Sequence, residues 1–198
     1  IILDFQMPNL RFCLLTLSLA GLGFWLSRVP EPSVSKTSQR PKLPVYFIEN
    51  QGQVDDRVSF YVQGRHTAAY FTSTSVYYSL REPTPMREAS TAPTRQAVVQ
   101  LEFLDANPEP LIQAVDRTGA IVSYFRGPKE EWKTGLATYS GVVYKDLWPG
   151  IDLEFTGPEG KLKYTFHVRP GADPKQIRLA YRGASRVSLA PSGSLQID

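Results

Sequence analysis

The sequence holds a single cysteine, Cys13, which lies inside a hydrophobic run near the N-terminus. The remainder of the chain therefore has no thiol for a disulfide, a cysteine-ligated zinc site or nucleophilic attack. Histidine is scarce too, because only His66 and His167 occur, and no G-x-S-x-G or similar nucleophile context accompanies them. We predict a protein that is not an enzyme and that holds no cofactor. A hydrolytic enzyme is the alternative that we rank third, after the two non-enzymatic functions given at the end of this subsection.

Concentrated positive charge is also lacking. The chain has 22 basic and 19 acidic residues, for a net charge of +3, and the two signs are interspersed. Because a nucleic-acid binder usually presents a basic stripe, we predict no nucleic-acid partner. Hydrophobic residues make up 42% of the chain and aromatic residues 12%, which is enough to build a folded core.

One hydrophobic run stands out, at residues 12–26, and it is uncharged with an arginine on each side. This is the pattern of an export signal. We expect Met7 to be the true start and residues 1–28 to form a signal peptide or an uncleaved signal-anchor helix. The run is shorter than the roughly 20 residues of a transmembrane helix, which favours cleavage, whereas the poor cleavage site around Ser27 favours an anchor. We therefore expect a secreted or cell-surface protein. If the segment is not cleaved, it would be the protein's sole contact with the membrane, and the protein would be in the periplasm or anchored to the inner membrane.

No long amphipathic helix pattern follows residue 45, which argues against most α/β enzyme folds. Residues 29–44 are rich in proline and serine and are predicted to be a linker. From residue 45 onward, short β-prone runs alternate with turn residues, which predicts an all-β, antiparallel, β-sandwich-like extracytoplasmic domain over residues 45–198. Strands are expected at residues 45–48, 58–63, 68–72, 76–81, 96–104, 111–115, 121–125, 138–144, 151–155, 162–168, 177–181, 186–189 and 195–197.

Alternation of apolar and polar residues predicts the buried face of several of these strands. Val58, Phe60 and Val62 are expected to share one face. The clearest hairpin joins residues 151–155 to 162–168, with one apolar face and one solvent-exposed polar face. The other expected features are a long loop, two turns and one helical turn, at residues 82–94, 116–119, 145–150 and 128–134.

Three segments carry short motifs in a characteristic order. They are E-N-Q-G-Q at 49–53, a block at 132–153 with W-x-T and P-G-I-D-L, and a block at 164–174 that ends in P-G-A-D-P. Together they resemble the N-terminal domain of bacterial SBBP-repeat (β-propeller repeat) exported proteins. The resemblance covers residues 45–198 and implies a non-enzymatic module that follows a signal peptide and precedes propeller repeats. It also implies partners among other domains of the same longer chain, so we expect the parent protein to continue beyond Asp198.

Aromatic residues crowd between residues 124 and 148. Exposed aromatic rings bind sugars or protein partners, so this group is the candidate ligand site. The alternative is that the rings lie in the core or at the edges of a β-sandwich. The members of the group are Tyr124, Trp132, Tyr139, Tyr144 and Trp148.

Acidic residues surround the turn at residues 148–150. Asp146, Asp152 and Glu154 are weak candidates for a metal site, because calcium binds several oxygen ligands on loops. Their spacing matches no known calcium loop, however, and the alternative is that they form the turn and the solvated face of a hairpin.

The functional prediction is a non-catalytic structural or interaction module of an exported, cell-surface or secreted protein. The alternative is a carbohydrate-binding module of the envelope, with a glycan or a surface protein as the partner. One observation separates them. A flat, exposed row of rings between residues 124 and 148 would favour a sugar ligand, whereas rings that point into the core would favour the structural module.

Overall fold

The structure is a computed structural model that describes residues 2–3, 44–64, 66–81, 96–191 and 195–197. The predicted export segment at 12–26 and the predicted loop at 82–94 lie outside these residues, as does the predicted linker apart from Pro44. Within the described ranges, no helix is long and apolar enough to cross a membrane.

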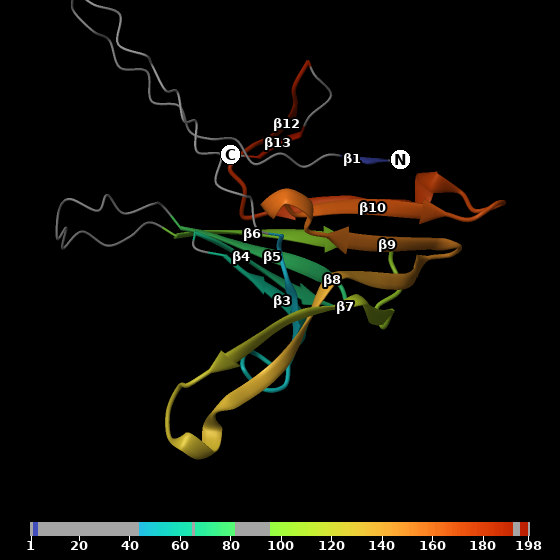
Figure 1. The fold of residues 1–198 in the computed structure, drawn as a ribbon. Coiled ribbons are helices and arrows are strands. Elements are labelled where there is room, and N and C mark those ends of the chain that lie inside the picture. Colours follow the sequence, from blue (N-terminus) through green and yellow to red (C-terminus); the bar gives the residue numbers. More distant parts are fainter. Residues whose placement is uncertain (1, 4–43, 65, 82–95, 192–194, 198) are drawn as a thin grey trace, which may run out of the picture. The chain divides into compact units, whose positions relative to one another are not determined.

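Antiparallel strands form most of the described chain, with three single-turn 3-10 helices between them (Figure 1). Every strand pair is antiparallel, which confirms the predicted all-β class. The strands are β1 (Ile2–Leu3), β2 (Phe47–Glu49), β3 (Val58–Gln63), β4 (Thr67–Thr72), β5 (Ser75–Arg81), β6 (Gln96–Phe103), β7 (Leu111–Tyr124), β8 (Lys133–Trp148), β9 (Ile151–Thr156), β10 (Lys163–Val168), β11 (Leu179–Arg182), β12 (Val187–Leu189) and β13 (Leu195–Ile197). The 3-10 helices are η1 (Lys129–Glu131), η2 (Pro158–Gly160) and η3 (Pro174–Gln176).

The sheet forks at β8. One edge of β8 pairs with β7, through residues that include Val142 and Tyr139. On the opposite edge, Val142 pairs with β9, whereas Tyr139 and Thr138 pair with β2. Two limbs therefore leave the same edge of one strand. The first limb is β9–β10, extended by β1, and the second is β2–β3–β4–β5–β6–β11.

The main hydrophobic core lies between these two limbs. Phe71 of β4 packs edge-to-face against Phe155 of β9, with ring centroids 5.1 Å apart. Phe103 of β6 packs in the same way against Tyr144 of β8, at 5.3 Å. The predicted sandwich-like packing is thus made by two limbs of one curled sheet, and not by two separate sheets. Among the described strands, only β12 and β13 pair apart from it, as a two-stranded sheet.

The predicted hairpin at residues 151–168 is confirmed, because β9 and β10 pair in continuous register. Ile151, Leu153 and Phe155 are fully buried, and the residues between them are partly exposed. Alternation is reliable here because one face meets the core and the other does not.

Strand β7 differs from the prediction, because it continues through residues 116–119, where a turn was expected. A shift of register against β8 absorbs the irregular residues, and Asp116 takes a left-handed φ of 42°. Asp tolerates this conformation better than most residues. The buried hydroxyl of Thr138 on β8 donates to the Ala120 carbonyl at 2.8 Å, which secures the irregular stretch against its neighbour.

Strand β8 is also longer than predicted, and it runs through most of the expected turn at 145–150. Only Pro149 and Gly150 connect it to β9. The register with β9 shifts between Tyr144 and Trp148, and Asp146 in this stretch has a φ of 48°. The turn residues in the sequence thus mark an irregular strand and a tight connection, not a loop.

The expected common face of Val58, Phe60 and Val62 is wrong for Val58. A bulge shifts the register between Val58 and Phe60, because Val58 pairs with Thr72 and Phe60 with Phe71. One extra residue reverses the side on which a strand residue lies. Phe60 and Val62 join the main core, whereas Val58 joins a second, smaller cluster.

Candidate functional site

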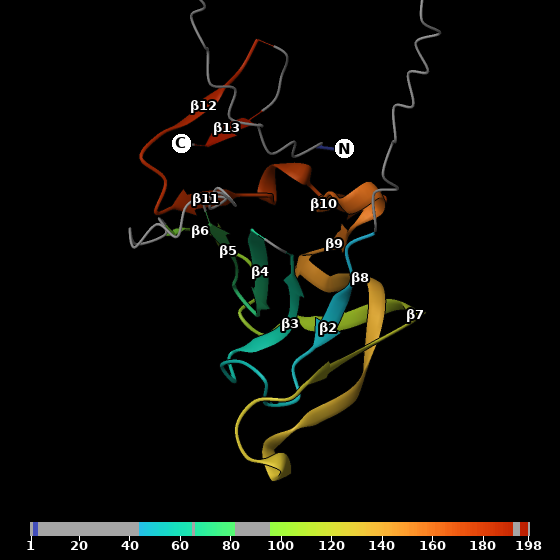
Figure 2. The same cartoon turned by 60° about the vertical axis from the view of Figure 1, so that its left-hand side comes forward.

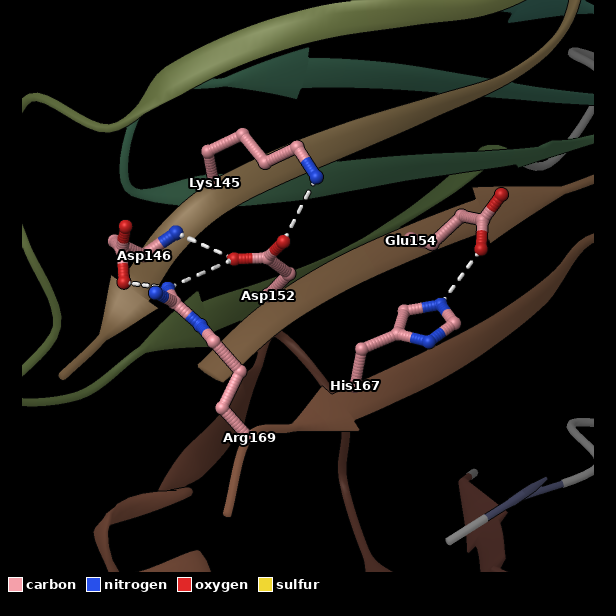
Figure 3. Close-up of polar contacts among 6 residues, drawn as sticks. All are labelled: Lys145, Asp146, Asp152, Glu154, His167 and Arg169. Carbon is pink, nitrogen blue, oxygen red and sulfur yellow. Dashed lines mark hydrogen bonds and ion pairs between the residues drawn. The ribbon is translucent and has the colours of Figure 1, made fainter. Parts of the chain in front are cut away.

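The three predicted metal candidates lie together on the non-core face of β8, β9 and β10 (Figure 3). The Asp152 carboxylate accepts a hydrogen bond from the Lys145 ammonium and another from the Asp146 backbone N–H, both at 2.8 Å. The Arg169 guanidinium contacts Asp146 and lies 3.6 Å from Asp152. Glu154 pairs with His167 across the hairpin, at 2.7 Å.

Each of these carboxylates therefore already faces a basic side chain. Burial disfavours the ionised form of Asp152, but the hydrogen bonds from Asp146 and Lys145 outweigh it and hold the pKa of this carboxyl below its usual range. Within the described residues, no group of three His, Cys, Asp or Glu side chains is placed to hold a metal ion. We call the network of Lys145, Asp146, Asp152 and Arg169 the polar lock. It joins the end of β8 and the start of β9 to the residue that follows β10.

The backbone around Gly150 shows what this lock holds in place. Arg169 donates its backbone N–H to the Gly150 carbonyl at 3.0 Å. Gly150 has a φ of 75°, and a Cβ there would lie 2.7 Å from the Cβ of Ala172. The P-G-I-D and P-G-A-D-P motifs thus meet in space. The close approach of Ala172 and the positive φ explain the glycine of the first motif, whereas Gly171 of the second is explained by its φ of 86° alone.

The five aromatic residues proposed as a ligand site do not form one row. Tyr144 and Trp148 are core residues, with exposed fractions of 0% and 1%. Tyr139 is half-buried and packs edge-to-face against Phe60. Trp132 and Tyr124 belong to the β7–β8 arm, which we define as residues 121–137, the distal ends of β7 and β8 with η1 between them.

A different aromatic cluster faces this arm. Tyr61, Tyr70 and Tyr77 are cross-strand neighbours on β3, β4 and β5, since Tyr61 pairs with Tyr70 and Tyr70 with Tyr77. The residues that precede or follow them in the sequence belong to the main core. These include Phe60, Phe71, Val76 and Tyr78. The three tyrosines therefore stand on the opposite, outer face of the sheet.

The β7–β8 arm covers one end of this tyrosine row. In Figures 1 and 2 the arm, in yellow, runs past the ends of β2 and β3. Its Tyr124 ring lies 6.3 Å from the Tyr61 ring, and its hydroxyl donates to Gln63 at 3.1 Å. Tyr61 lies almost parallel to Tyr70, with a centroid distance of 6.4 Å. The rings therefore turn their faces toward one another, and Tyr61 is buried between its neighbours with 2% exposure.

A cleft opens between the arm and the outer face of the sheet. We call it the tyrosine cleft, and its volume is about 610 Å³. A second hollow of about 680 Å³ adjoins it along β4 and β5 and shares Val54 and Tyr70 with it. Tyr70 thus lies at the junction of the two hollows, and Tyr77 lines the second. Together the hollows form a groove across three strands.

The turn after β2 builds one wall of the cleft. The Asn50 side chain organises this turn, because its carbonyl accepts the backbone N–H groups of Gly52 and Gln53, each at 3.1 Å. Its amide donates to the carbonyls of Asp55 and Val58, each at 2.9 Å. The Asn50 side chain thus satisfies the backbone groups of a turn, which explains the E-N-Q-G-Q motif.

The charge in the cleft comes from both sides. Arg81 on β5 and Arg126 and Lys133 on the arm line it, together with Glu130 and Glu131 of η1. The Arg126 guanidinium lies 6.0 Å from the Tyr124 ring centroid. Burial raises the pKa of Tyr61 far above its ordinary value, so this hydroxyl keeps its proton and can donate a hydrogen bond.

The comparison with protein-family models gives one match, to a domain of unknown function, DUF7948, over residues 47–198. The chain belongs to the DUF7948 family. The match spans all strands from β2 onward, so both the polar lock and the tyrosine cleft lie inside the family domain. No curated protein and no solved structure matches the chain.

Sequence reasoning missed the three tyrosines of the outer face, although a signal was present. Each lies next to another aromatic residue, in Phe60–Tyr61, Tyr70–Phe71 and Tyr77–Tyr78. Adjacent residues of a strand point to opposite faces, so each pair places an aromatic ring on a face that would otherwise be polar. Three such pairs on consecutive expected strands indicate a second aromatic surface.

Proposed function

We propose that this chain is a non-catalytic interaction module of an exported protein and that the tyrosine cleft is its binding face. The observation that carries the proposal is the groove formed by the two hollows over Tyr61, Tyr70 and Tyr77, under the β7–β8 arm. Tyrosine, tryptophan and arginine are the residues that most often carry binding energy at interfaces.

The groups that line the cleft suit binding by contact. They are phenol rings and hydroxyls, the amides of Gln53 and Gln63, and guanidinium groups. A sheet face that is exposed to water normally carries small polar or charged residues, and a contiguous aromatic surface there marks an interaction site. The arm holds its side of the cleft in place through the hydrogen bond from Tyr124 to Gln63.

A binding array tests this proposal. The full chain is applied to an array of glycans and peptides, together with two variants. Tyr70→Ala removes the ring at the junction of the hollows, and Phe125→Ala removes a ring of the arm that is 63% exposed and lies outside the cleft lining. We expect Tyr70→Ala to abolish the array signal and Phe125→Ala to retain it. Loss of signal only in Phe125→Ala, or an array without any ligand, would refute the proposal.

Export is the second part of the proposal, and it rests on the hydrophobic run at residues 12–26. A reporter enzyme that becomes active only after export, such as alkaline phosphatase, is fused to the C-terminus of the full chain. The fusion should be active, and a Leu14→Arg/Leu15→Arg variant, which interrupts the run, should be inactive. Equal activity of the two fusions would contradict an export role for this segment.

The resemblance to the N-terminal domain of SBBP-repeat proteins supports a wider proposal. In it, the module sits at the envelope or is secreted as part of a longer chain, and other domains of that chain are among its partners. Sequencing the gene downstream of Asp198 tests this directly. An open frame that continues into propeller repeats is expected, and a stop codon immediately after Asp198 would count against it.

A further inference from the structure

We infer that the tyrosine cleft binds an acidic polysaccharide, as an extended chain laid across β3, β4 and β5. This inference rests on the proposed function and adds the class of ligand. Three features of the cleft lead to it: its cations, the pairing of its floor, and its continuation into the second hollow.

The first feature is the set of cations. Arg81, Arg126 and Lys133 line the cleft, and none of them pairs with a carboxylate among the described residues. Arg57, Arg169, Arg178 and Arg182 each have an acidic partner. Arg117 on β7 has none among the described residues either, so the distinguishing feature is that three such cations line one cleft. An anionic ligand would supply the partners that these three lack, and guanidinium groups bind carboxylates through charge-assisted hydrogen bonds.

The acidic residues of the cleft cancel only part of this charge, because two carboxylates face three cations. Glu130 and Glu131 belong to η1 at the end of the arm. The Glu131 carboxylate folds toward Gly127, where a Cβ would lie 2.4 Å from one of its oxygens. Lys133, by contrast, reaches across to the turn after β2, with its ammonium 3.7 Å from the position of a Cβ on Gly52. A cation therefore stands where the arm and the turn approach each other.

The second feature separates a glycan from a peptide. The floor of the cleft is formed by β3 and β4, and each of these strands pairs with a neighbour on both edges. No free strand edge is available in this floor for a peptide backbone to pair with, which is the usual way in which a sheet binds an extended peptide. The floor presents side chains instead, with phenol hydroxyls and glutamine amides that match the hydroxyl groups of a sugar chain.

The third feature is the length of the groove. The second hollow continues from the tyrosine cleft along Tyr70 to Tyr77, and neighbouring strands are roughly 5 Å apart. Successive tyrosines are thus spaced by about the length of one sugar ring. Tyr61 is buried beneath its neighbours, so we expect the partly exposed Tyr70 and Tyr77 to contact the sugar. Because the Tyr61 and Tyr70 rings turn their faces toward one another, this contact is expected through edges and hydroxyls, with charge supplying most of the selectivity.

The experiment uses the full chain and isothermal titration calorimetry with three probes. The first is a short oligogalacturonate, the second is the same oligosaccharide with its carboxylates reduced to alcohols, and the third is an oligoglutamate peptide of equal charge. We expect binding of the first probe only, and we expect its affinity to fall as salt is raised toward about 150 mM, because the cleft is open to solvent.

Three variants test the role of charge. Arg126→Gln should weaken binding of oligogalacturonate by about tenfold, the loss of one charge-assisted contact. Glu130→Gln should strengthen it by about twofold to fivefold, because a like charge is removed. Arg117→Gln is the matched control, since Arg117 is an exposed arginine of β7 outside the cleft lining, and its change should alter the affinity by less than about twofold.

Each other outcome overturns the inference. Equal binding of the reduced oligosaccharide would show a neutral-sugar site, and equal binding of oligoglutamate would show a site for acidic peptides. An absence of binding to all three probes would remove the acidic-glycan class. If the array then still finds another ligand that depends on Tyr70, only this inference falls and the proposed function stands. If dependence on Tyr70 is lost as well, both fall.

Discussion

Replacement of Trp148 by alanine should be one of the most damaging single changes in this chain. Trp148 is 1% exposed, and it packs against Phe103 and Phe166 from opposite limbs of the sheet, with ring centroids 6.2 and 6.0 Å away. Its indole N–H donates to the Leu104 carbonyl at 3.0 Å. The side chain therefore joins both limbs and satisfies a backbone carbonyl between them.

The expected cost follows from these contacts. Truncation of a buried tryptophan to alanine typically lowers the free energy of unfolding by about 3–5 kcal/mol. We expect Trp148→Ala near the top of that range, because the Leu104 carbonyl also loses its donor. A domain of this kind has a total stability of about 5–15 kcal/mol, so the variant should retain only part of it. Trp148→Phe keeps a ring but not the N–H, and should cost about 1–3 kcal/mol.

Trp132 provides the matched control. Its ring is 39% exposed and contacts Phe125 on the arm, so Trp132→Ala should cost about 1 kcal/mol or less. Urea unfolding of the full chain, followed by far-ultraviolet circular dichroism, gives all four free energies without depending on tryptophan fluorescence. If Trp132→Ala were as destabilising as Trp148→Ala, the placement of Trp148 between the two limbs would be refuted.

Three further changes test other parts of the fold. Asp152→Asn should remove an acid-sensitive part of the stability, because the pKa of Asp152 is lower in the folded chain than its ordinary value of 3.8. The wild type should have the larger free energy of unfolding above about pH 4, and this difference should vanish as the pH falls below that value. A difference that instead grows in acid would contradict the polar lock. Gly157→Ala should cost about 1–3 kcal/mol, since the new Cβ would lie 2.3 Å from the Cβ of Val45, whereas Gly119→Ala, with open space around it, should be neutral in the same urea titration. Asn50→Ala should cost about 1–3 kcal/mol and weaken binding in the tyrosine cleft, as measured by urea unfolding and calorimetry; unchanged stability would show that its hydrogen bonds to the turn are dispensable.

Local patterns predicted the strands well where each strand has one buried and one open face. The β9–β10 hairpin is the best case, because Leu153 and Phe155 alternate with polar residues along a regular strand. The cap of η3 was also predictable, since Asp173 accepts a hydrogen bond from the Lys175 backbone N–H at 3.0 Å, as its place before a proline turn suggests.

The errors come from irregular strands and from contacts between distant segments. The residues at 116–119 read as a turn, yet in β7 they form an irregular stretch that the hydroxyl of Thr138, from another strand, holds in place. Val58 was placed on the wrong face because alternation cannot reveal a bulge. The tyrosine cleft depends on strand register and on an arm more than forty positions further along the chain, which no local pattern encodes.

The fork at β8 also sets the order in which this chain can fold. Phe47 finds its partner Tyr139 only after the intervening segment has been synthesised, and closing such a long loop is slow because it is entropically expensive. Neither limb can be completed before β8 exists, so the nascent chain stays open until most of the domain has been made. If residues 12–26 direct export, as we propose, the chain would reach a translocation channel while it is still unfolded enough to pass through. The closing step would then take place on the far side of the membrane.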